Sequence, residues 1–204
     1  SVTLDINNLD EIAPSITSGD TAVAINENTG ASQVIYTATA TDDADTSAGV
    51  TFSLTGDSDP ALSIDSLTGA VTLSTDPDYE AQSQYSFTVV ASDGVNEAVE
   101  QSVTLDINNL DEIAPSITSG DTAVAINENT GASQVIYTAT ADDSLDTSAG
   151  VTFSLSSGSD AALSIDSTTG AVTLSTDPDH ETQSQYSFTV VASDGVNEAV
   201  EQSV

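Results

Sequence analysis

Acidic side chains gather in four clusters in each half of the sequence, and these side chains are the ones best suited to chemistry. The first half has Glu27; Asp42, Asp43 and Asp45; Asp78 and Glu80; and Asp93. The second half has Glu128; Asp142, Asp143 and Asp146; Asp179 and Glu181; and Asp194. The segments that precede the two halves add Asn8, Asp10 and Glu11, and then Asn109, Asp111 and Glu112.

Side chains of this kind supply the oxygen ligands that calcium prefers. Calcium takes about six to eight ligands from carboxylates, amide carbonyls, backbone and water, so one half with its linker could fill about two or three sites. Magnesium fits less well, because it demands an octahedron and retains water. The predicted ligands are all of these residues except Asp43 and Asp142. We expect Asp43 and Asp57 to be solvated, because Ser144 and Gly158 replace them in the second half.

The charge balance also points to a cation from outside the chain. The sequence has no Lys or Arg and 33 Asp and Glu, which gives a formal net charge of −33. These carboxylates repel one another in a compact state, and no basic side chain compensates them. Without Lys or Arg the chain has no means of neutralising phosphates, so the sequence predicts no nucleic acid and no anionic membrane as partner.

The remaining composition restricts the class of protein further. There is no Cys, which rules out disulfides, thiolate metal sites and cysteine nucleophiles. Hydrophobic residues make up 38% of the chain, enough for small packed cores. No apolar run approaches the roughly 18 residues of a membrane span, and no signal peptide is visible. We therefore expect an internal fragment whose targeting signals lie elsewhere.

The sequence is a tandem repeat. Residues 1–101 and 102–202 differ at ten positions, namely 41, 43, 44, 55, 56, 57, 60, 67, 79 and 81 and their counterparts 101 residues later. A period of this length is the size of an independent domain rather than of a solenoid repeat. In this frame residues 1–9 are the last strand of a preceding repeat, 10–110 the first repeat, and 111–204 a second repeat with a truncated last strand. Residues 1–9 either stay unpaired or pair with a neighbouring molecule's second domain.

Each period predicts about seven β-strands separated by turn residues, as in a sandwich. Alternation places Tyr85, Phe87, Val89 and Ala91 on one face of a strand, and Val50, Phe52 and Leu54 on one face of another. The same alternation places Val34, Tyr36, Ala38 and Ala40 on one face of a third strand. Further strands are expected at 23–25, 62–65, 70–74 and 99–108, the last burying Val99, Val103, Leu105 and Ile107. Gly69, in the turn after Asp65, is expected to need a positive φ.

Three stretches of the first half resemble the cadherin repeat: residues 64–71, the triplet Asp78-Tyr79-Glu80, and residues 85–93. The resemblance covers nearly the whole of both copies and implies an Ig-like, Greek-key β-sandwich. It also implies calcium ligands at Glu27-Asn28, at Asp78 with Glu80, at Asp93, and in the linker from Asn109 to Pro115. The sequence departs from the family at two points: Glu112-Ile113 stands where an Asp-Asn pair is usual, and Asn26 rather than proline precedes Glu27.

The style of the repeats is also similar to extender repeats of large bacterial adhesins secreted by the type I (RTX) route, including ice-binding adhesins. This resemblance implies a calcium-rigidified spacer on the bacterial cell surface, a monomeric rod in which neighbouring repeats contact one another and hold a distal adhesive domain away from the cell. Calcium ions between domains would fix the joints. The alternative is a carbohydrate-binding or homophilic adhesion module, with polysaccharide as the candidate ligand in the first case.

Other interpretations of the same residues are weaker. Paired carboxylates about 5–10 Å apart would suit a glycosidase, but repeat domains seldom carry a full active site in each copy, and the chain has only 5 Tyr and 4 Phe. We predict no enzyme. His180, the single histidine, replaces Tyr79 and is interpreted as a surface substitution. The Thr-x-Thr spacing at 37–41 occurs on one strand only, which does not make an ice-binding face.

Overall fold

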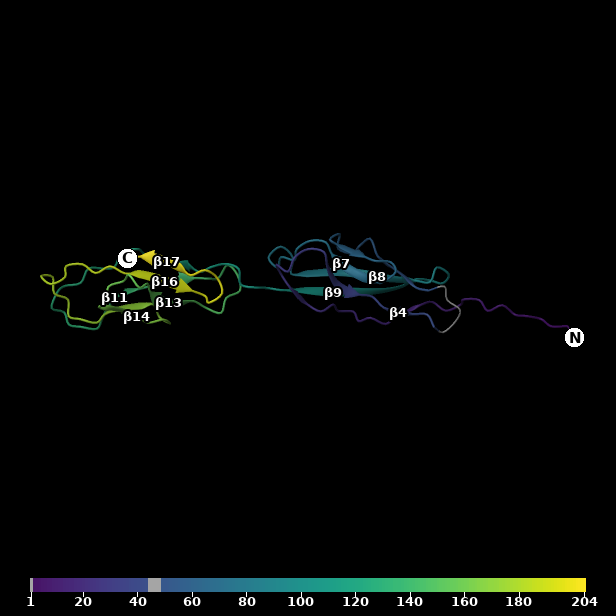
Figure 1. The fold of residues 1–204 in the computed structure, drawn as a ribbon, viewed down its shortest axis with the longest axis horizontal. Helices are drawn as coiled ribbons and strands as arrows, with labels where there is room; N and C mark the ends of the chain where they lie inside the picture. The colour runs from purple at the N-terminus through teal and green to yellow at the C-terminus, as the bar shows by residue number, and fades with distance from the viewer. Residues whose placement is uncertain (1, 44–48) are drawn as a thin grey trace. The chain divides into compact units, whose positions relative to one another are not determined.

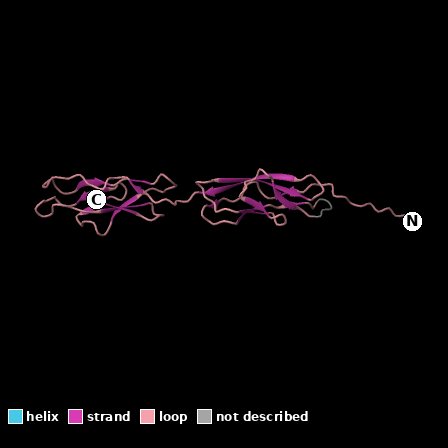
Figure 2. Cartoon of the chain, turned by 90° about the horizontal axis from the view of Figure 1, so that it is seen from above, coloured by secondary structure: helices cyan, strands magenta, loops and turns pink. Residues whose placement is uncertain are grey.

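The computed structural model describes residues 2–43 and 49–204, and every regular element in these ranges is a β-strand (Figures 1 and 2). No helix of membrane-spanning length and hydrophobicity occurs within them. The chain divides into two compact units, Ser1–Asn109 and Leu110–Val204. The predicted all-β, tandem-sandwich architecture is confirmed.

The described residues of the first unit form three sheets. Its strands are β1 (Ser15–Ile16), β2 (Ile25–Asn26), β3 (Gln33–Thr37), β4 (Ala40–Thr41), β5 (Thr51–Leu54), β6 (Leu62–Ile64), β7 (Ala70–Leu73), β8 (Gln84–Ser92) and β9 (Val99–Asn108). The four-stranded sheet has the order β2-β9-β8-β5, the three-stranded sheet has the order β3-β7-β6, and β1 pairs with β4. All pairs are antiparallel except β2 with β9, which is parallel.

The second unit repeats this plan, with shorter strands only at the counterparts of β8 and β9. Its strands are β10 (Ser116–Ile117), β11 (Gln134–Thr138), β12 (Ala141–Asp142), β13 (Thr152–Leu155), β14 (Leu163–Ile165), β15 (Ala171–Leu174), β16 (Thr189–Ser193) and β17 (Val200–Ser203). Its sheets are β11-β15-β14, β13-β16-β17 and β10-β12. Residues 126–127, the counterpart of β2, form no strand.

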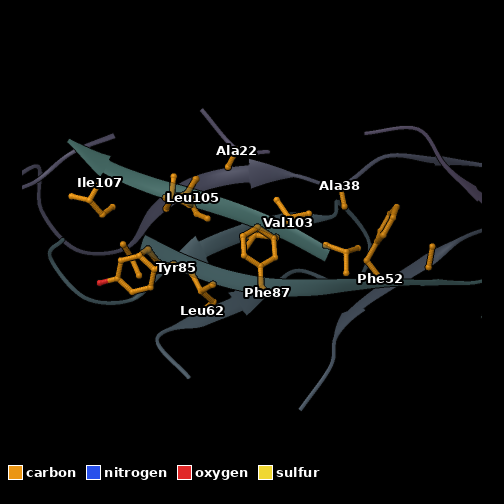
Figure 3. Close-up of a cluster of buried hydrophobic side chains, with 14 residues drawn as sticks. Ala22, Ala38, Phe52, Leu62, Tyr85, Phe87, Val103, Leu105 and Ile107 are labelled. Atoms are coloured by element: carbon orange, nitrogen blue, oxygen red, sulfur yellow. The ribbon is translucent and has the colours of Figure 1, made fainter. Parts of the chain in front are cut away.

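The core of the first unit lies between the two larger sheets (Figure 3). Tyr85, Phe87, Val89 and Ala91 on β8 are all buried, as are Val103, Leu105 and Ile107 on β9. The predicted alternation on these two strands is therefore correct, because one face of the sheet packs on the core while the other faces solvent. Val99, which was also expected to be buried, is only half-buried.

The prediction for the third strand is partly wrong. Val34 is 60% exposed and Ile35 is 7% exposed, although Val34 was expected to face inward with Tyr36 and Ala38. The pairing of β3 with β7 shifts register between Val34 and Tyr36, which is a β-bulge. One extra residue in a strand exchanges the two faces, so alternation read from the sequence fails at this point.

The turn after β6 matches its prediction. Gly69 has a φ of 69°, and a Cβ at this position would collide with the carbonyl oxygen of Ala38. The side chain of Asp65 accepts hydrogen bonds from the backbone amides of Leu67 (3.0 Å) and Thr68 (2.8 Å). These bonds, with that of the Thr68 hydroxyl, lower the pKa of Asp65. Glycine is required here both by the backbone conformation and by the close approach of the Ala38 backbone, which lies between β3 and β4.

Candidate metal centres

The ends of β8 position the acidic residues of the first unit. Asp93 directly follows β8, and Asp78 and Glu80 precede its first residue, Gln84. A strand of nine residues spans about 30 Å, so these two sets of carboxylates lie at opposite ends of the sandwich. Glu27 follows β2 and Asp42 follows β4, which brings one further carboxylate to each end.

The first cluster consists of Asp10, Asp42 and Asp93, each of which offers an oxygen within 4.8 Å of the others. Asp93 is buried, and its Oδ1 accepts hydrogen bonds from the amides of Val95 and Asn96, both at 2.8 Å. The Asn96 side-chain amide donates to Asp10 Oδ1 at 2.8 Å and to Asp93 Oδ2 at 3.0 Å. The bond from the Asn96 side chain, followed by those from the two amides, lowers the pKa of Asp93, so this carboxyl is ionised.

Three oxygens of this cluster are buried without a hydrogen bond. Asp10 Oδ2 and both Oδ1 and Oδ2 of Asp42 accept none from any residue that the structure describes. A buried carboxylate oxygen without a partner is costly, and a carboxylate beside two others is more so. A divalent cation bound to these oxygens would satisfy them, and carboxylate oxygens are ligands that suit calcium. The donor set therefore fits a calcium ion.

The second cluster consists of Glu27, Asp78 and Glu80. Glu27 is only 1% exposed, and its Oε2 accepts a hydrogen bond from the amide of Tyr79 at 2.7 Å. Asp78 Oδ1 accepts one from the amide of Ala81 at 2.9 Å. Asn109, which directly follows β9, has a buried side-chain oxygen without a hydrogen bond among the described residues. These oxygens again are of the kind that calcium takes as ligands.

The second unit repeats both clusters as Asp111, Asp143 and Asp194, and as Glu128, Asp179 and Glu181. Asn197 donates to Asp111 Oδ1 at 2.7 Å and to Asp194 Oδ2 at 3.0 Å, as Asn96 does in the first unit. The hydrogen bond from the amide of Val196 is the main cause that lowers the pKa of Asp194.

The two copies of the Glu27 cluster differ in burial. Glu128 is exposed, whereas Glu27 is buried. The amide of His180 is 3.3 Å from Glu128 Oε2, which is longer than the corresponding 2.7 Å from Tyr79 to Glu27. The hydroxyl of Thr182, which has no counterpart at Ala81, donates to Asp179 at 2.7 Å and lowers its pKa.

The structure thus brings twelve of the predicted residues into four clusters. Glu11, Glu112 and Asp146 lie outside them; the amide of Glu112 donates to Asp146 Oδ2 at 2.9 Å. Asn8 is exposed, and Asp45 lies outside the described residues. Asn96 and Asn197 were missed by the sequence analysis. The signal that could have found them is the Asp-Gly-x-Asn spacing. In a turn that begins with Asp, the side-chain amide three residues later can donate a hydrogen bond to the carboxylate of that Asp.

Comparison with known proteins identifies the family. The family described as "Cadherin domain" matches residues 21–108 and 122–204. Protocadherin Fat 2 of Mus musculus is 31% identical over 153 residues, which are 74% of this chain and 4% of that protein. Protocadherin Fat 1 of Homo sapiens is 28% identical over 201 residues, 96% of this chain and 4% of that protein. The chain therefore spans about 4% of the length of these relatives.

Solved structures show the same fold. Mouse cadherin-23 EC22-24 superimposes with a TM-score of 0.73 at 24% identity, covering 95% of this chain and 65% of that one. Drosophila N-cadherin EC1-4 superimposes with a TM-score of 0.72 at 21% identity, covering 95% of this chain and 49% of that one. The resemblance to bacterial RTX and ice-binding adhesins receives no support from these comparisons. Cadherin domains in general bind calcium and serve adhesion rather than catalysis. With both repeats matched over nearly their whole length, the chain belongs to the cadherin domain family.

Proposed function

We propose that this chain is a pair of calcium-stiffened, extracellular spacer repeats, in which the four carboxylate clusters hold calcium. The observation that carries the proposal is the set of three buried, unpartnered oxygens on Asp10 and Asp42. In a chain with no Lys or Arg, no basic side chain is available to compensate them. Binding of a divalent cation supplies the missing positive charge and the missing ligand contacts at once.

The residues of the connecting segment give the ion a mechanical role. Asp111 belongs to this segment and also to the cluster with Asp143 and Asp194, so a cation held there fixes the segment to the second repeat. At the other end, Asn108 accepts a hydrogen bond from the amide of Glu27 at 3.3 Å, beside the Glu27 cluster. Both ends of the segment are thus tied, each within its own repeat, and the linker loses conformational freedom when calcium binds.

We propose repeat boundaries at residues 10–110 and 111–204, with residues 1–9 acting as the last strand of the preceding unit. An extracellular location agrees with carboxylate sites of this kind, since calcium sites of extracellular modules work in the roughly 0.1–1 mM range. A monomeric rod of such repeats would hold a distal adhesive domain away from its anchor. Placement of the array on a bacterial adhesin rests only on repeat style and composition, and the named relatives lend it no support.

A second candidate function is adhesion between copies of the chain, as the family's role in adhesion suggests. Polysaccharide binding stays an untested alternative.

Calorimetric titration with calcium, together with thermal melting in calcium and in chelator, tests the proposed function. We expect saturable binding and a large rise in melting temperature, because a ligand present at about 100 times its Kd stabilises the folded state by about 2.7 kcal/mol. The variant Asp42→Asn should weaken binding, whereas Asp57→Asn, at an exposed position that is Gly158 in the second repeat, should not. Equal melting temperatures in calcium and chelator would mean that the carboxylates are solvated and that the spacer proposal is wrong.

A further inference from the structure

The aspartates that directly follow β8 and β16 are each followed by glycine. Asp93-Gly94 and Asp194-Gly195 are the two Asp-Gly pairs of the sequence. The backbone nitrogen after an aspartate can attack the carboxyl carbon of that aspartate, and glycine leaves the attack unhindered because it has no Cβ. At these two pairs the peptide backbone itself can therefore rearrange.

The turn that holds Asp93 in its cluster requires glycine at the next position. Gly94 has a φ of 82° and Gly195 a φ of 89°, a conformation that residues other than Gly, Asn and Asp rarely adopt. Gly94 is exposed, and a Cβ there would have no heavy atom within 4 Å, so water reaches the peptide. The backbone conformation that places the Asp93 carboxylate thus also presents a reactive peptide bond to solvent.

Both reacting groups are engaged in hydrogen bonds in the folded turn. Asp93 Oδ1 accepts bonds from the amides of Val95 and Asn96, and Oδ2 accepts one from the Asn96 side chain. The Gly94 amide donates to the hydroxyl of Ser92 at 3.1 Å. The copy in the second repeat has the same four bonds. Ring closure removes the amide hydrogen and one carboxyl oxygen, so it breaks their hydrogen bonds and is favoured by local opening of the turn.

The carboxylate cluster controls how readily this turn opens. Asn96, which closes the turn, also donates to Asp10 Oδ1 at 2.8 Å, and Asp10, Asp42 and Asp93 offer oxygens within 4.8 Å of one another. Among the described residues, three oxygens of Asp10 and Asp42 are buried without a hydrogen bond. Without a cation the three carboxylates repel one another, which favours opening, whereas a shared divalent cation holds all three in place.

We propose that Asp93-Gly94, with its copy Asp194-Gly195, is a modification site at which loss of calcium starts the conversion of aspartate to isoaspartate. This inference rests on the proposed calcium binding and adds a slow covalent step to it. The Gly94 nitrogen bonds to Cγ of Asp93, and one carboxyl oxygen leaves as water with the amide proton and one proton from solvent. Water then opens the resulting succinimide ring at the main-chain carbonyl of Asp93. The peptide bond is left on Cγ and a free carboxylate on Cα, and one proton returns to solvent.

The product no longer supports the cluster. The main chain gains one carbon between Asp93 and Gly94, and the free carboxylate is bonded directly to Cα instead of through Cβ. Asn96 is then displaced from Asp10, which it orients in the intact turn. Calcium binding needs several oxygens to meet at one point, so isoaspartate formation at Asp93 should abolish the first cluster's site and leave the second repeat's site intact.

Parallel incubation in calcium and in chelator, at equal ionic strength and below both melting transitions, tests the proposal. Mass spectrometry with electron-based fragmentation measures isoaspartate at each position. We expect it to form at Asp93 and Asp194 in chelator, and at least about tenfold more slowly in saturating calcium, because a bound ligand lowers the open population. Asp65-Ser66 is the internal comparison: Asp65 accepts similar amide hydrogen bonds but belongs to none of the four clusters, so its slow rate should be equal in both buffers.

The variant Gly94→Asn tests the attacking group. Asparagine tolerates a positive φ, and its side chain hinders the attack of its own nitrogen. Isoaspartate at Asp93 should therefore fall severalfold, while its formation at Asp194 in the same molecule stays unchanged and serves as the matched control. Equal amounts at Asp93 in the parent and the variant would contradict the proposed reaction.

Calcium titration separates this inference from the proposed function. Fresh protein should bind calcium in both repeats, and the fraction with isoaspartate at Asp93, isolated by chromatography, should lose the first cluster's site alone. If fresh protein binds calcium but isoaspartate forms equally fast in both buffers, or if the modified fraction binds as before, the isoaspartate proposal alone is wrong. If fresh protein binds no calcium, the proposed function fails as well.

Discussion

The side-chain amide of Asn96 donates to Asp10 Oδ1 at 2.8 Å and to Asp93 Oδ2 at 3.0 Å, and so holds together two carboxylates that are 83 positions apart in the sequence. The same nitrogen is 3.2 Å from the carbonyl oxygen of Ile12. Asn96 thus orients the ligands of a cluster without being an acidic residue itself. Groups that orient ligands in this way commonly affect metal affinity almost as strongly as the ligands.

Substitution Asn96→Ala should weaken calcium binding at the first cluster about tenfold, because Asp10 and Asp93 lose the donor that positions them. Calorimetric titration measures this change. The substitution Asn197→Ala provides an internal comparison, since Asn197 makes the same two bonds to Asp111 and Asp194 and should affect only the second repeat's site. Unchanged affinities in both variants would show that the asparagines serve the turn alone.

Substitution Asp42→Asn should change stability in opposite directions with and without calcium. In chelator it removes one of three clustered negative charges, so the melting temperature should rise slightly. In saturating calcium it removes a ligand, and a tenfold loss of affinity corresponds to about 1.4 kcal/mol of lost stabilisation. Thermal melting of wild type and variant, each in chelator and in saturating calcium, gives the four melting temperatures to compare. A variant less stable in both buffers would indicate that Asp42 is a structural residue and not a ligand.

Substitution Gly69→Ala should destabilise the first repeat by about 2 kcal/mol, since the new Cβ meets the Ala38 carbonyl oxygen and φ is +69°. The melting temperature should fall by at least about 5 °C. Gly56→Ala is the matched control, because a Cβ there has no heavy atom within 4 Å and should leave the melting temperature nearly unchanged. Equal effects of the two substitutions would contradict the packing argument.

Asp65 should make stability depend on pH in a specific direction. Its pKa in the folded protein lies below the ordinary value of 3.8, chiefly because the amide and hydroxyl of Thr68 donate to it. A lowered folded-state pKa means that the contribution to stability is complete above about 3.8 and is lost as the pH falls through the folded-state pKa. The difference in unfolding free energy between wild type and Asp65→Asn should therefore shrink between pH 7 and pH 3.

This comparison is made in chelator, so that calcium release does not contribute. The pKa values of Asp93, Asp166, Asp179 and Asp194 are lowered as well, so acidification also removes their contributions to stability. Only the difference in unfolding free energy between wild type and Asp65→Asn isolates the contribution of Asp65. A difference that stays constant from pH 7 to pH 3 would contradict the lowered pKa.

Much of this protein follows from local sequence. Alternation along β8 and β9 predicts which side chains enter the core, because successive residues of a strand point to opposite faces. The need for glycine at position 69 follows from turn chemistry. The proposal of calcium as the cation follows from composition, since oxygen ligands and the absence of Lys and Arg favour it whatever the fold.

The tertiary structure decided what depends on distant contacts. The bulge in β3 exchanges Val34 and Ile35, and its cause lies in the pairing with β7 rather than in either residue. Asn96 reaches Asp10 only because the strand order brings both to the same end of the sandwich. Glu27 is buried because the end of β9 pairs with β2 beside it, a contact between segments that lie far apart in the sequence. Local sequence specifies the chemistry of each side chain. Its burial, and which distant side chains it contacts, are set by the strands and loops that pack beside it.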